Sequence, residues 1–286
     1  MNFKNCIRTL CLAVLCSNLT AQNLSHPIVD VHFHVKTIPA EEYSPFMTME
    51  EYFIENKSFN IKHLFGLTIA QRNRIEETKT RNDSLFSMSR RDLRFIPVYS
   101  VHPLDGEAAI EELHRIKKLG GKIIKLHPSN QIFPILGNEM INVARVAGEL
   151  GLVILIDGYG MVVPNYLENL MQLTLANRQT KFIIAHMGGS DFHKLGAFST
   201  VRILNPEMFA NVWYDLSVTT NIYADSPYKS QFEWVIRSIG VDRVLFGTDN
   251  PVVSLSEALN AFYKLDFDDS EREKILYKNA IELLGL

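Results

Sequence analysis

Short apolar runs alternate with longer amphipathic stretches along the chain from residue 27 to its end. The short runs are rich in β-branched and aromatic residues and are bounded by glycine, proline or charged residues. At these lengths, such a composition favours strands over helices. The runs predicted as strands are 28–34, 61–69, 95–101, 123–127, 152–157, 182–186, 212–217 and 244–247.

The stretches between these strands have helical periodicity. Apolar residues recur at every third position across 107–119, and two glycines follow at 120–121, as at the end of a helix. A similar pattern at 273–284 closes the chain. Strands that alternate with helices predict parallel βα units, and eight such units close into a (β/α)8 TIM barrel, an α/β fold. An open doubly wound sheet is the alternative, although no glycine-rich phosphate-binding turn follows the first strand.

The sequence predicts a single folded domain over 22–286, because no repeat, low-complexity tract or flexible linker divides it. An apolar fraction of 47% is that of an ordinary globular protein. The net charge of −3 and the pI near 6.3 give no basic footprint. Nucleic acid is therefore not an expected partner. We expect a small-molecule substrate instead.

The first residues have the composition of a secretory signal. Lys4 and Arg8 precede a short apolar run at 10–16, and small residues lead to a cleavage site after Ala21. The run is too short to span a membrane, and no later run approaches that length. We expect 1–21 to be a signal peptide and the mature chain to be exported, periplasmic or secreted, without a membrane-spanning segment. The alternative is that this segment is an apolar first helix of the fold.

All three cysteines, Cys6, Cys11 and Cys16, lie inside the predicted signal. The mature chain would then have no disulfide, no thiolate nucleophile and no zinc site built from cysteine. Cys16 is also a candidate for lipid anchoring, which the large Leu15 before it makes the weaker interpretation.

Candidate chemistry begins in the first predicted strand, which reads Asp30-Val31-His32-Phe33-His34. Because side chains alternate along a strand, Asp30, His32 and His34 are expected to face the barrel interior, and the other two to face the helices. Two imidazoles two residues apart at the carboxyl end of a strand can share one divalent metal ion. In a chain with nine histidines, one such pair is weak evidence by itself.

Other predicted strands end in residues of the same kind. The alternation turns Lys125 and His127 inward from the fourth strand, Asp157 from the fifth and His186 from the sixth, and Asp249 follows the eighth. Buried polar groups are costly unless they have partners, so a whole rim of them is hard to explain by packing. A hydrogen-bonded core histidine explains any one of these residues alone, whereas the set indicates a metal-dependent site.

The sequence resembles the amidohydrolase superfamily, specifically the amidohydrolase-related branch that includes the aminocarboxymuconate semialdehyde decarboxylase-like enzymes. The matching segments, in family order, are VDVHFH at 29–34, GGKIIKLHP at 120–128, FIIAHMGG at 182–189, YDLS at 214–217 and FGTDNP at 246–251. The resemblance implies a (β/α)8 barrel in which His32, His34 and Asp249 bind the metal. It also implies that His186 polarises the substrate or transfers protons.

One residue departs from the family pattern. The family usually ends strand five with a histidine that is a further metal ligand, and this chain has Asp157 there. An aspartate oxygen can bind Zn2+, so we expect one divalent ion held by His32, His34, Asp157 and Asp249. Zn2+ is the expected ion, and the harder, more negative ligand set makes Mn2+ or Mg2+ the alternatives. The alternative is that the protein has lost tight metal binding because Asp157 stands in place of the histidine.

Lys125 and His127 are assigned to substrate binding. Lys125 would pair with a carboxylate on the substrate or with Asp157. A carboxylated lysine on strand four bridges two metals in some superfamily members, but the branch resembled here mostly uses one metal. His127 is either a substrate contact or a structural histidine beside Pro128.

These residues predict a mononuclear metal hydrolase that opens a lactone, ester or amide bond with a metal-activated water. Asp249 would accept the proton of the water, and His186 would donate to the developing oxyanion. Two alternatives stay open: a non-oxidative decarboxylase on the same barrel, and a binding protein that has lost its metal. The products distinguish decarboxylation, which releases carbon dioxide, from hydrolysis, which adds water. The metal content of the purified protein distinguishes a binding protein from an enzyme.

Two further segments are candidates for substrate or subunit contacts. The stretch at 36–60 is rich in aromatic residues and lacks strong periodicity. A lid or a homodimer contact is one interpretation, and a packed surface excursion is the other. Arg72 and Arg74 follow the second strand, and Tyr99 lies near the end of the third, where these residues could anchor a substrate carboxylate. For the two arginines, solvated surface is the alternative.

Overall fold

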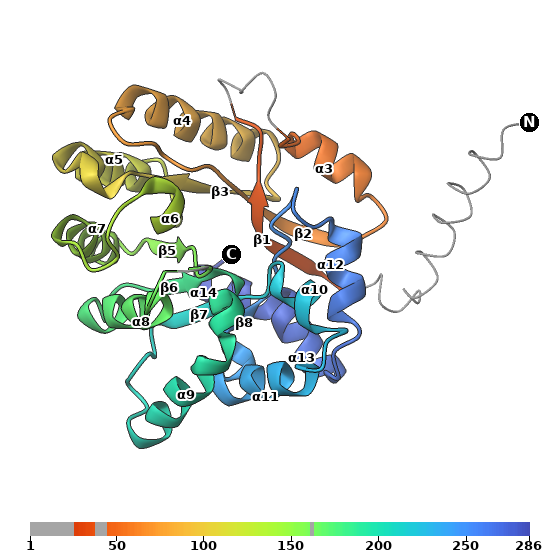
Figure 1. Cartoon of the computed structure of the whole chain (residues 1–286). Coiled ribbons are helices and arrows are strands. Elements are labelled where there is room, and N and C mark those ends of the chain that lie inside the picture. Colours follow the sequence, from red (N-terminus) through yellow and green to blue (C-terminus); the bar gives the residue numbers. More distant parts are fainter. Residues whose placement is uncertain (1–25, 38–44, 161–162) are drawn as a thin grey trace, which may run out of the picture.

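Eight parallel strands form the centre of the molecule. The computed structural model describes residues 26–37, 45–160 and 163–286, and Figure 1 looks into the barrel from the carboxyl ends of its strands. Each strand pairs with the next along the chain, so the predicted strands are confirmed to within a few residues at their ends. They are β1 (Ile28–His34), β2 (Ile61–Leu67), β3 (Phe95–Ser100), β4 (Ile123–Leu126), β5 (Val153–Ile156), β6 (Phe182–Ile184), β7 (Val212–Asp215) and β8 (Val244–Leu245).

Backbone contacts between the first and last strands close the sheet. The Val31 amide donates to the Phe246 carbonyl at 3.1 Å, and the His34 amide donates to the Asn250 carbonyl at 3.0 Å. Phe33 and Asn250 form a parallel bridge beyond the end of β8. These contacts confirm the (β/α)8 barrel and show that an open doubly wound sheet is wrong for this chain.

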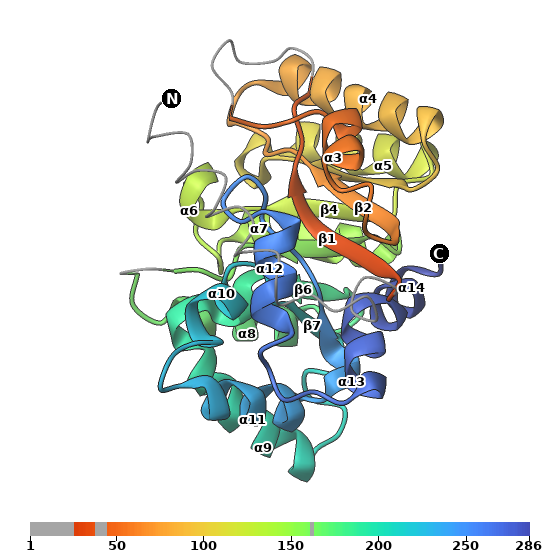
Figure 2. The same ribbon diagram turned by 90° about the vertical axis from the view of Figure 1, so that its right-hand side faces the viewer.

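Helices cover the outside of the barrel, and Figure 2 shows them around β1 in a side view. The helix expected at 107–119 is confirmed as α5, whereas the one at 273–284 is divided by a π-helical turn, Lys274–Lys278. The helices are α3 (Met49–Glu55), α4 (Ile75–Arg91), α5 (Glu107–Lys118), α6 (Pro128–Gln131), α7 (Asn138–Glu149), α8 (Tyr166–Ala176), α9 (Leu195–Leu204), α10 (Thr219–Tyr223), α11 (Lys229–Ile239), α12 (Leu255–Phe262), α13 (Asp269–Glu273) and α14 (Asn279–Leu284). None of the described helices is long and apolar enough to cross a membrane.

The apolar core has two parts. One packs the outer strand faces against the helices, and the other contains alternate residues of β2 to β6, such as Phe65, Ile123 and Leu155. The second part also contains Leu283 and Leu284 of α14, which lies at the opposite end of the barrel from the mouth (Figure 2). The amino-terminal half of the barrel is therefore filled with apolar side chains, and polar chemistry is confined to the mouth.

The predicted alternation of side chains fails at one point in β1. The pairing register with β2 shifts between Asp30 and Phe33, so β1 has one extra residue there. Val31 belongs to the same apolar cluster as Val29, and the Asp30 carboxylate contacts Tyr52 of α3. The expectation that Asp30 faces the site and Val31 faces the helices is therefore wrong, because a bulge shifts the alternation of side chains.

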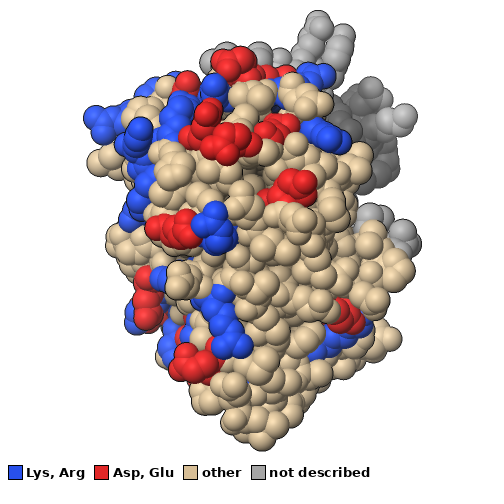
Figure 3. All heavy atoms as spheres, turned by 90° about the vertical axis from the view of Figure 1, so that its left-hand side faces the viewer, with Lys and Arg blue, Asp and Glu red and all other residues tan. Residues whose placement is uncertain are grey.

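The predicted signal peptide at 1–21 lies outside the described residues, and export remains a prediction. Figure 3 shows one face of the molecule with the mouth of the barrel to the right. Acidic and basic side chains are mixed on this face and lie mostly away from the mouth (Figure 3).

Candidate metal centre at the barrel mouth

Two histidines of β1 and one aspartate beyond β8 meet at the mouth of the barrel. Oδ1 of Asp249 lies 3.2 Å from Nε2 of His32 and 3.1 Å from Nε2 of His34. The Asp249 amide donates to the His32 carbonyl at 2.7 Å, which fixes the aspartate beside β1. One oxygen and two imidazole nitrogens at mutual distances below 4.8 Å are a donor set that fits a divalent ion.

His32 is oriented by a carboxylate on its other ring nitrogen. Nδ1 of His32 lies 3.0 Å from Oδ2 of Asp215, the last residue of β7, and both side chains are buried. A carboxylate at Nδ1 fixes the orientation of the ring, with Nε2 toward Asp249, and strengthens Nε2 as a metal ligand. The sequence analysis quoted Asp215 inside the YDLS segment but gave it no role. Its position at the end of a strand was the signal that could have identified it.

We expect Asp215→Asn to weaken binding of a divalent ion by about 10- to 100-fold. The amide cannot stabilise the His32 ring as a carboxylate does. Isothermal titration of the metal-free protein with Zn2+ or Mn2+ measures the change. Asp242→Asn, whose side chain is 65% exposed, is the matched control, and an unchanged affinity in Asp215→Asn would contradict the role.

Lys125 is buried behind the pocket rather than lining it. Its side chain is among the most deeply buried in the protein, and Nζ lies 3.1 Å from Nε2 of His32. Burial lowers the pKa of Lys125, opposed by the negative charges of Asp157, Asp249 and Asp215. Both partners expected for Lys125, Asp157 and a substrate carboxylate, remain predictions.

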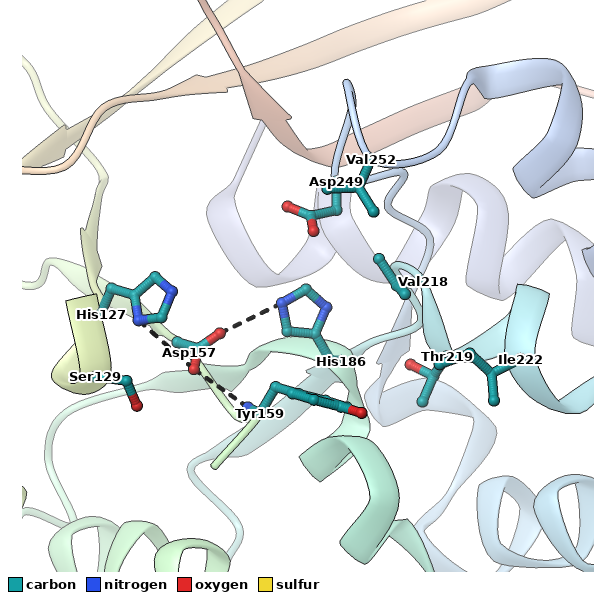
Figure 4. Close-up of a pocket in the computed structure, with 10 residues that line it drawn as sticks. All are labelled: His127, Ser129, Asp157, Tyr159, His186, Val218, Thr219, Ile222, Asp249 and Val252. Atoms are coloured by element: carbon teal, nitrogen blue, oxygen red, sulfur yellow. Dashed lines mark hydrogen bonds and ion pairs between the residues drawn. The ribbon is translucent and has the colours of Figure 1, made fainter. Parts of the chain in front are cut away.

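Asp157 lies between two histidines, as Figure 4 shows. Its Oδ1 is 3.4 Å from Nε2 of His186, and its Oδ2 is 3.6 Å from Nδ1 of His127. Burial raises the pKa of Asp157, but the contact with His186 and the charges of His127 and Lys125 outweigh burial and lower it. Among the described residues, two groups are close enough to share an ion, His32 with His34 and Asp249, and His32 with His186 and Asp215, and Asp157 belongs to neither. Its role as a fourth ligand remains a prediction.

His186 follows β6 in a turn of left-handed backbone, with φ of 57°. Nδ1 lies 3.1 Å from the Ser217 carbonyl, so Nε2 faces Asp157 and the pocket. Burial opposes protonation of this ring, but the contact with Asp157 and the charges of Asp215 and Asp249 raise the pKa of His186 above its usual value. The raised pKa favours the imidazolium, in which both ring nitrogens donate hydrogen bonds.

The structure predicts the protonation state of His127. Burial lowers the pKa of His127 to about 4, since its neighbour Asp157 offsets burial only in part. In the unfolded chain a histidine titrates near 6.5, so the folded state binds fewer protons between pH 6.5 and 4. The contribution of His127 to the free energy of unfolding is therefore complete above pH 6.5 and is lost as the pH falls from 6.5 to 4. We expect the His127 ring in the metal-free protein to stay neutral at pH 5.5, which NMR of its ring nitrogens measures. Protonation near pH 6.5 would contradict the assignment.

A pocket of about 380 Å3 opens above these groups. His127, Asp157, His186 and Asp249 line it together with Ser129. The remaining lining residues are mostly apolar: Tyr159, Val218, Thr219, Ile222 and Val252. In Figure 4, Val218, Thr219 and Ile222 lie on the far side of His186 from Asp157, and Val252 lies beside Asp249. The site therefore has one polar wall that can react and one apolar wall that can hold a hydrocarbon group.

Asp30 ties the end of β8 to β1. Its carboxylate accepts hydrogen bonds from the amides of His32 (3.1 Å) and Thr248 (3.0 Å), the Thr248 hydroxyl (2.8 Å) and the Tyr52 hydroxyl (2.7 Å). Burial raises the pKa of Asp30 to about 6, and these hydrogen bonds oppose the rise. Because Thr248 precedes Asp249, Asp30 fixes the backbone that presents Asp249 to His32.

Three residues considered for substrate binding lie elsewhere. Arg74, directly before α4, is exposed and pairs with Glu77 at 3.0 Å, and Arg72 is also exposed. Tyr99 is buried in the cluster between strands and helices. Neither arginine nor Tyr99 lines the pocket, and the two arginines lie on the surface, as the alternative for them predicted. From the 36–60 stretch, Phe46 stacks on His34 with ring centroids 5.4 Å apart, and 38–44 lies outside the described residues.

Comparison with known proteins identifies the family of this chain. The sequence profile of the amidohydrolase family matches residues 29–286. The chain belongs to the amidohydrolase family. The resemblance drawn from the five sequence segments is confirmed, and the protein is an amidohydrolase-family enzyme. No curated protein matches the chain.

Solved structures share the fold at low sequence identity. A 2,6-dihydroxybenzoate decarboxylase in complex with 2,6-dihydroxybenzoate aligns with a TM-score of 0.72 at 17% identity, over 91% of this chain and 100% of the other. A dihydroxybenzoic acid decarboxylase from a Polaromonas species, with bound manganese and 2-nitroresorcinol, gives 0.71 at 16%, over 91% and 97%. A probable 2-pyrone-4,6-dicarboxylic acid hydrolase from Acinetobacter baumannii gives 0.64 at 17%, over 91% and 99%.

Proposed function

We propose that this protein is a metal-dependent hydrolase that adds water to the carbonyl carbon of a small lactone, ester or amide. The observation that carries the proposal is the position of Asp249. Its carboxylate contacts the Nε2 atoms of both His32 and His34 and also lines the pocket. One group can thus hold an ion and face the substrate.

His32, His34 and Asp249 would hold the divalent ion. When bound, such an ion lowers the pKa of a coordinated water toward neutrality and supplies a nucleophile. Burial raises the pKa of Asp249, but its interactions with His32 and His34 outweigh burial and hold the pKa below its ordinary value. Asp249 is therefore a carboxylate at neutral pH and is free to accept a proton.

The residues around Asp249 suit hydrolysis. As the water oxygen bonds to the carbonyl carbon, Asp249 would accept the proton of the water and later pass it to the leaving oxygen or nitrogen. His186 would donate from Nε2 to the oxygen that gains negative charge, because its raised pKa favours the protonated ring. The apolar wall would position the rest of the substrate.

Non-oxidative decarboxylation is the second candidate, favoured by the comparisons. Two of the structures described above are decarboxylases of hydroxybenzoates, and the same residues could protonate a ring carbon as carbon dioxide leaves.

The experiment that tests the proposal measures product and metal together. Purified protein is stripped with a chelator, and turnover of a lactone and ester panel is followed before and after adding Zn2+ or Mn2+. We expect addition of water to one of these compounds, lost on stripping and restored by metal. Release of carbon dioxide from a hydroxybenzoate, without hydrolysis, would favour the second candidate. A protein that takes up less than about a tenth of an equivalent of metal would instead be a binding protein, as the sequence analysis allowed.

A further inference from the structure

One buried amide side chain joins three loops at the barrel mouth, and the proposed reaction does not use it. Gln131 is the last residue of α6 and is 5% exposed. Its Nε2 donates to the carbonyls of Ala70 and Val101, both at 2.9 Å, and its Oε1 accepts from the His127 amide at 2.8 Å. Ala70 follows β2, Val101 follows β3 and His127 follows β4. Both donors and the acceptor of this side chain are therefore used to hold the three loops together.

A buried histidine fixes Gln131 from its backbone side. Nδ1 of His102 accepts from the Leu104 amide at 3.2 Å, so the ring proton lies on Nε2. Nε2 donates to the Gln131 carbonyl at 2.7 Å, and the His102 side chain is buried. A buried polar network in which each group has its partner makes the segment that contains it rigid.

These contacts determine how the His127 ring lies. α6 is a single helical turn, which has little stability by itself. Gln131 fastens the turn, because it accepts from the His127 amide and donates its own amide to the His127 carbonyl at 2.8 Å. The turn places the Asn130 amide 3.3 Å from Nδ1 of His127, which therefore accepts. In Figure 4 the second ring nitrogen of His127, Nε2, faces the open part of the pocket.

We propose that Gln131 is a positioning residue, which holds the His127 ring so that Nε2 donates a hydrogen bond to an oxygen atom of the substrate. The contact with the substrate rests on the proposed function. The orientation of the ring rests only on the contacts of His127 with Gln131 and Asn130 and on the support that His102 gives. None of these contacts involves a residue expected to hold the metal ion.

The first experiment measures the orientation of the ring without a substrate. The ring nitrogens of His127 are observed by NMR at neutral pH, and their signals are assigned by their loss in His127→Phe. We expect the wild type to show one neutral tautomer with its proton on Nε2, with or without added Zn2+. Gln131→Met nearly keeps the size of the side chain and removes its three hydrogen bonds. In the metal-free variant α6 should loosen, and a second tautomer with its proton on Nδ1 should appear.

Two further variants separate positioning from general loss of stability. The Asn211 side chain also donates to three backbone carbonyls, at 2.8 to 3.2 Å, but it precedes β7 at the opposite end of the barrel. Asn211→Leu should therefore destabilise the fold and leave the His127 signals unchanged. His102→Phe removes the donor to the Gln131 carbonyl and should shift the signals in the same direction as Gln131→Met. It decides the question if Gln131→Met fails to fold.

The second experiment follows a substrate that the protein turns over. We expect Gln131→Met to lower kcat/KM by about 10- to 100-fold, mainly through KM, because a misplaced donor weakens binding. When His127→Phe is already present, Gln131→Met should have little further effect. A residue that only stabilised the fold would act equally with and without His127.

The outcomes separate this inference from the proposed function. The inference is overturned if the wild-type ring has its proton on Nδ1, if the signals are unchanged in both Gln131→Met and His102→Phe, or if Asn211→Leu changes them equally. Equal kinetic effects of Gln131→Met with and without His127 overturn its role toward the substrate. If the signals change as expected but no lactone or ester is hydrolysed, the positioning of His127 stands and the proposed hydrolysis fails.

Discussion

Replacing Asp249 with asparagine is expected to lower kcat/KM by about 100- to 10,000-fold, the range for loss of a general base. The amide removes the negative charge between Nε2 of His32 and Nε2 of His34 and cannot accept a proton from water. Asparagine tolerates the left-handed backbone at this position, where φ is 63°, so the fold should survive. Turnover, metal content and circular dichroism of the purified variant measure the three effects.

The control for this substitution is Asp266→Asn, which makes the same chemical change where the side chain is 84% exposed. It should keep full activity and metal content. Wild-type turnover by Asp249→Asn, with a normal circular dichroism spectrum, would refute its role as a base. Loss of turnover with full metal content would assign proton transfer to Asp249 and metal binding to other groups.

Replacing Asp30 with asparagine is expected to lower the free energy of unfolding by about 3 kcal/mol. Four donors converge on this buried carboxylate, and an amide would direct its own N–H groups at two of them. Buried donors left without an acceptor lose their hydration without replacement, which makes such changes costly. Urea unfolding followed by circular dichroism measures the difference.

Tyr52→Phe is the matched comparison, because it removes only the hydroxyl donor of the same cluster. We expect it to cost about 1 kcal/mol. If Asp30→Asn is no less stable than Tyr52→Phe, the carboxylate does not hold the end of β8. Metal affinity should also fall in Asp30→Asn and stay nearly unchanged in Tyr52→Phe, since only the first loosens the backbone before Asp249.

The strands of the barrel could be predicted because their pattern is local. A strand buried in a parallel sheet is a short, continuous apolar run, and this pattern is visible in the local sequence of runs such as 123–127 and 182–186. The rim residues were predictable for the same reason, because parallel strands bring their carboxyl ends to one mouth. His32, His34 and Asp249 were found in this way.

Other features depend on contacts between residues that are far apart in the sequence, and a local sequence pattern does not show such contacts. The bulge in β1, which turns Asp30 away from the site, depends on pairing with β2. The contacts of Asp215 with His32 and of Lys125 with the same ring join β7 and β4 to β1 across the barrel. Asp157 lies between His127 and His186, a position that the sequence pattern could not give, and its role as a fourth metal ligand remains a prediction.

The sequence by itself determined the barrel, its family and the residue types that gather at its mouth, because strand periodicity and the order of motifs are properties of neighbouring residues. Only the tertiary structure decided which atom of each residue faces which partner. That choice depends on the register between strands, on the turns after β6 and β8, and on the burial that sets each protonation state. The chemistry of this protein depends on these contacts between its strands and turns.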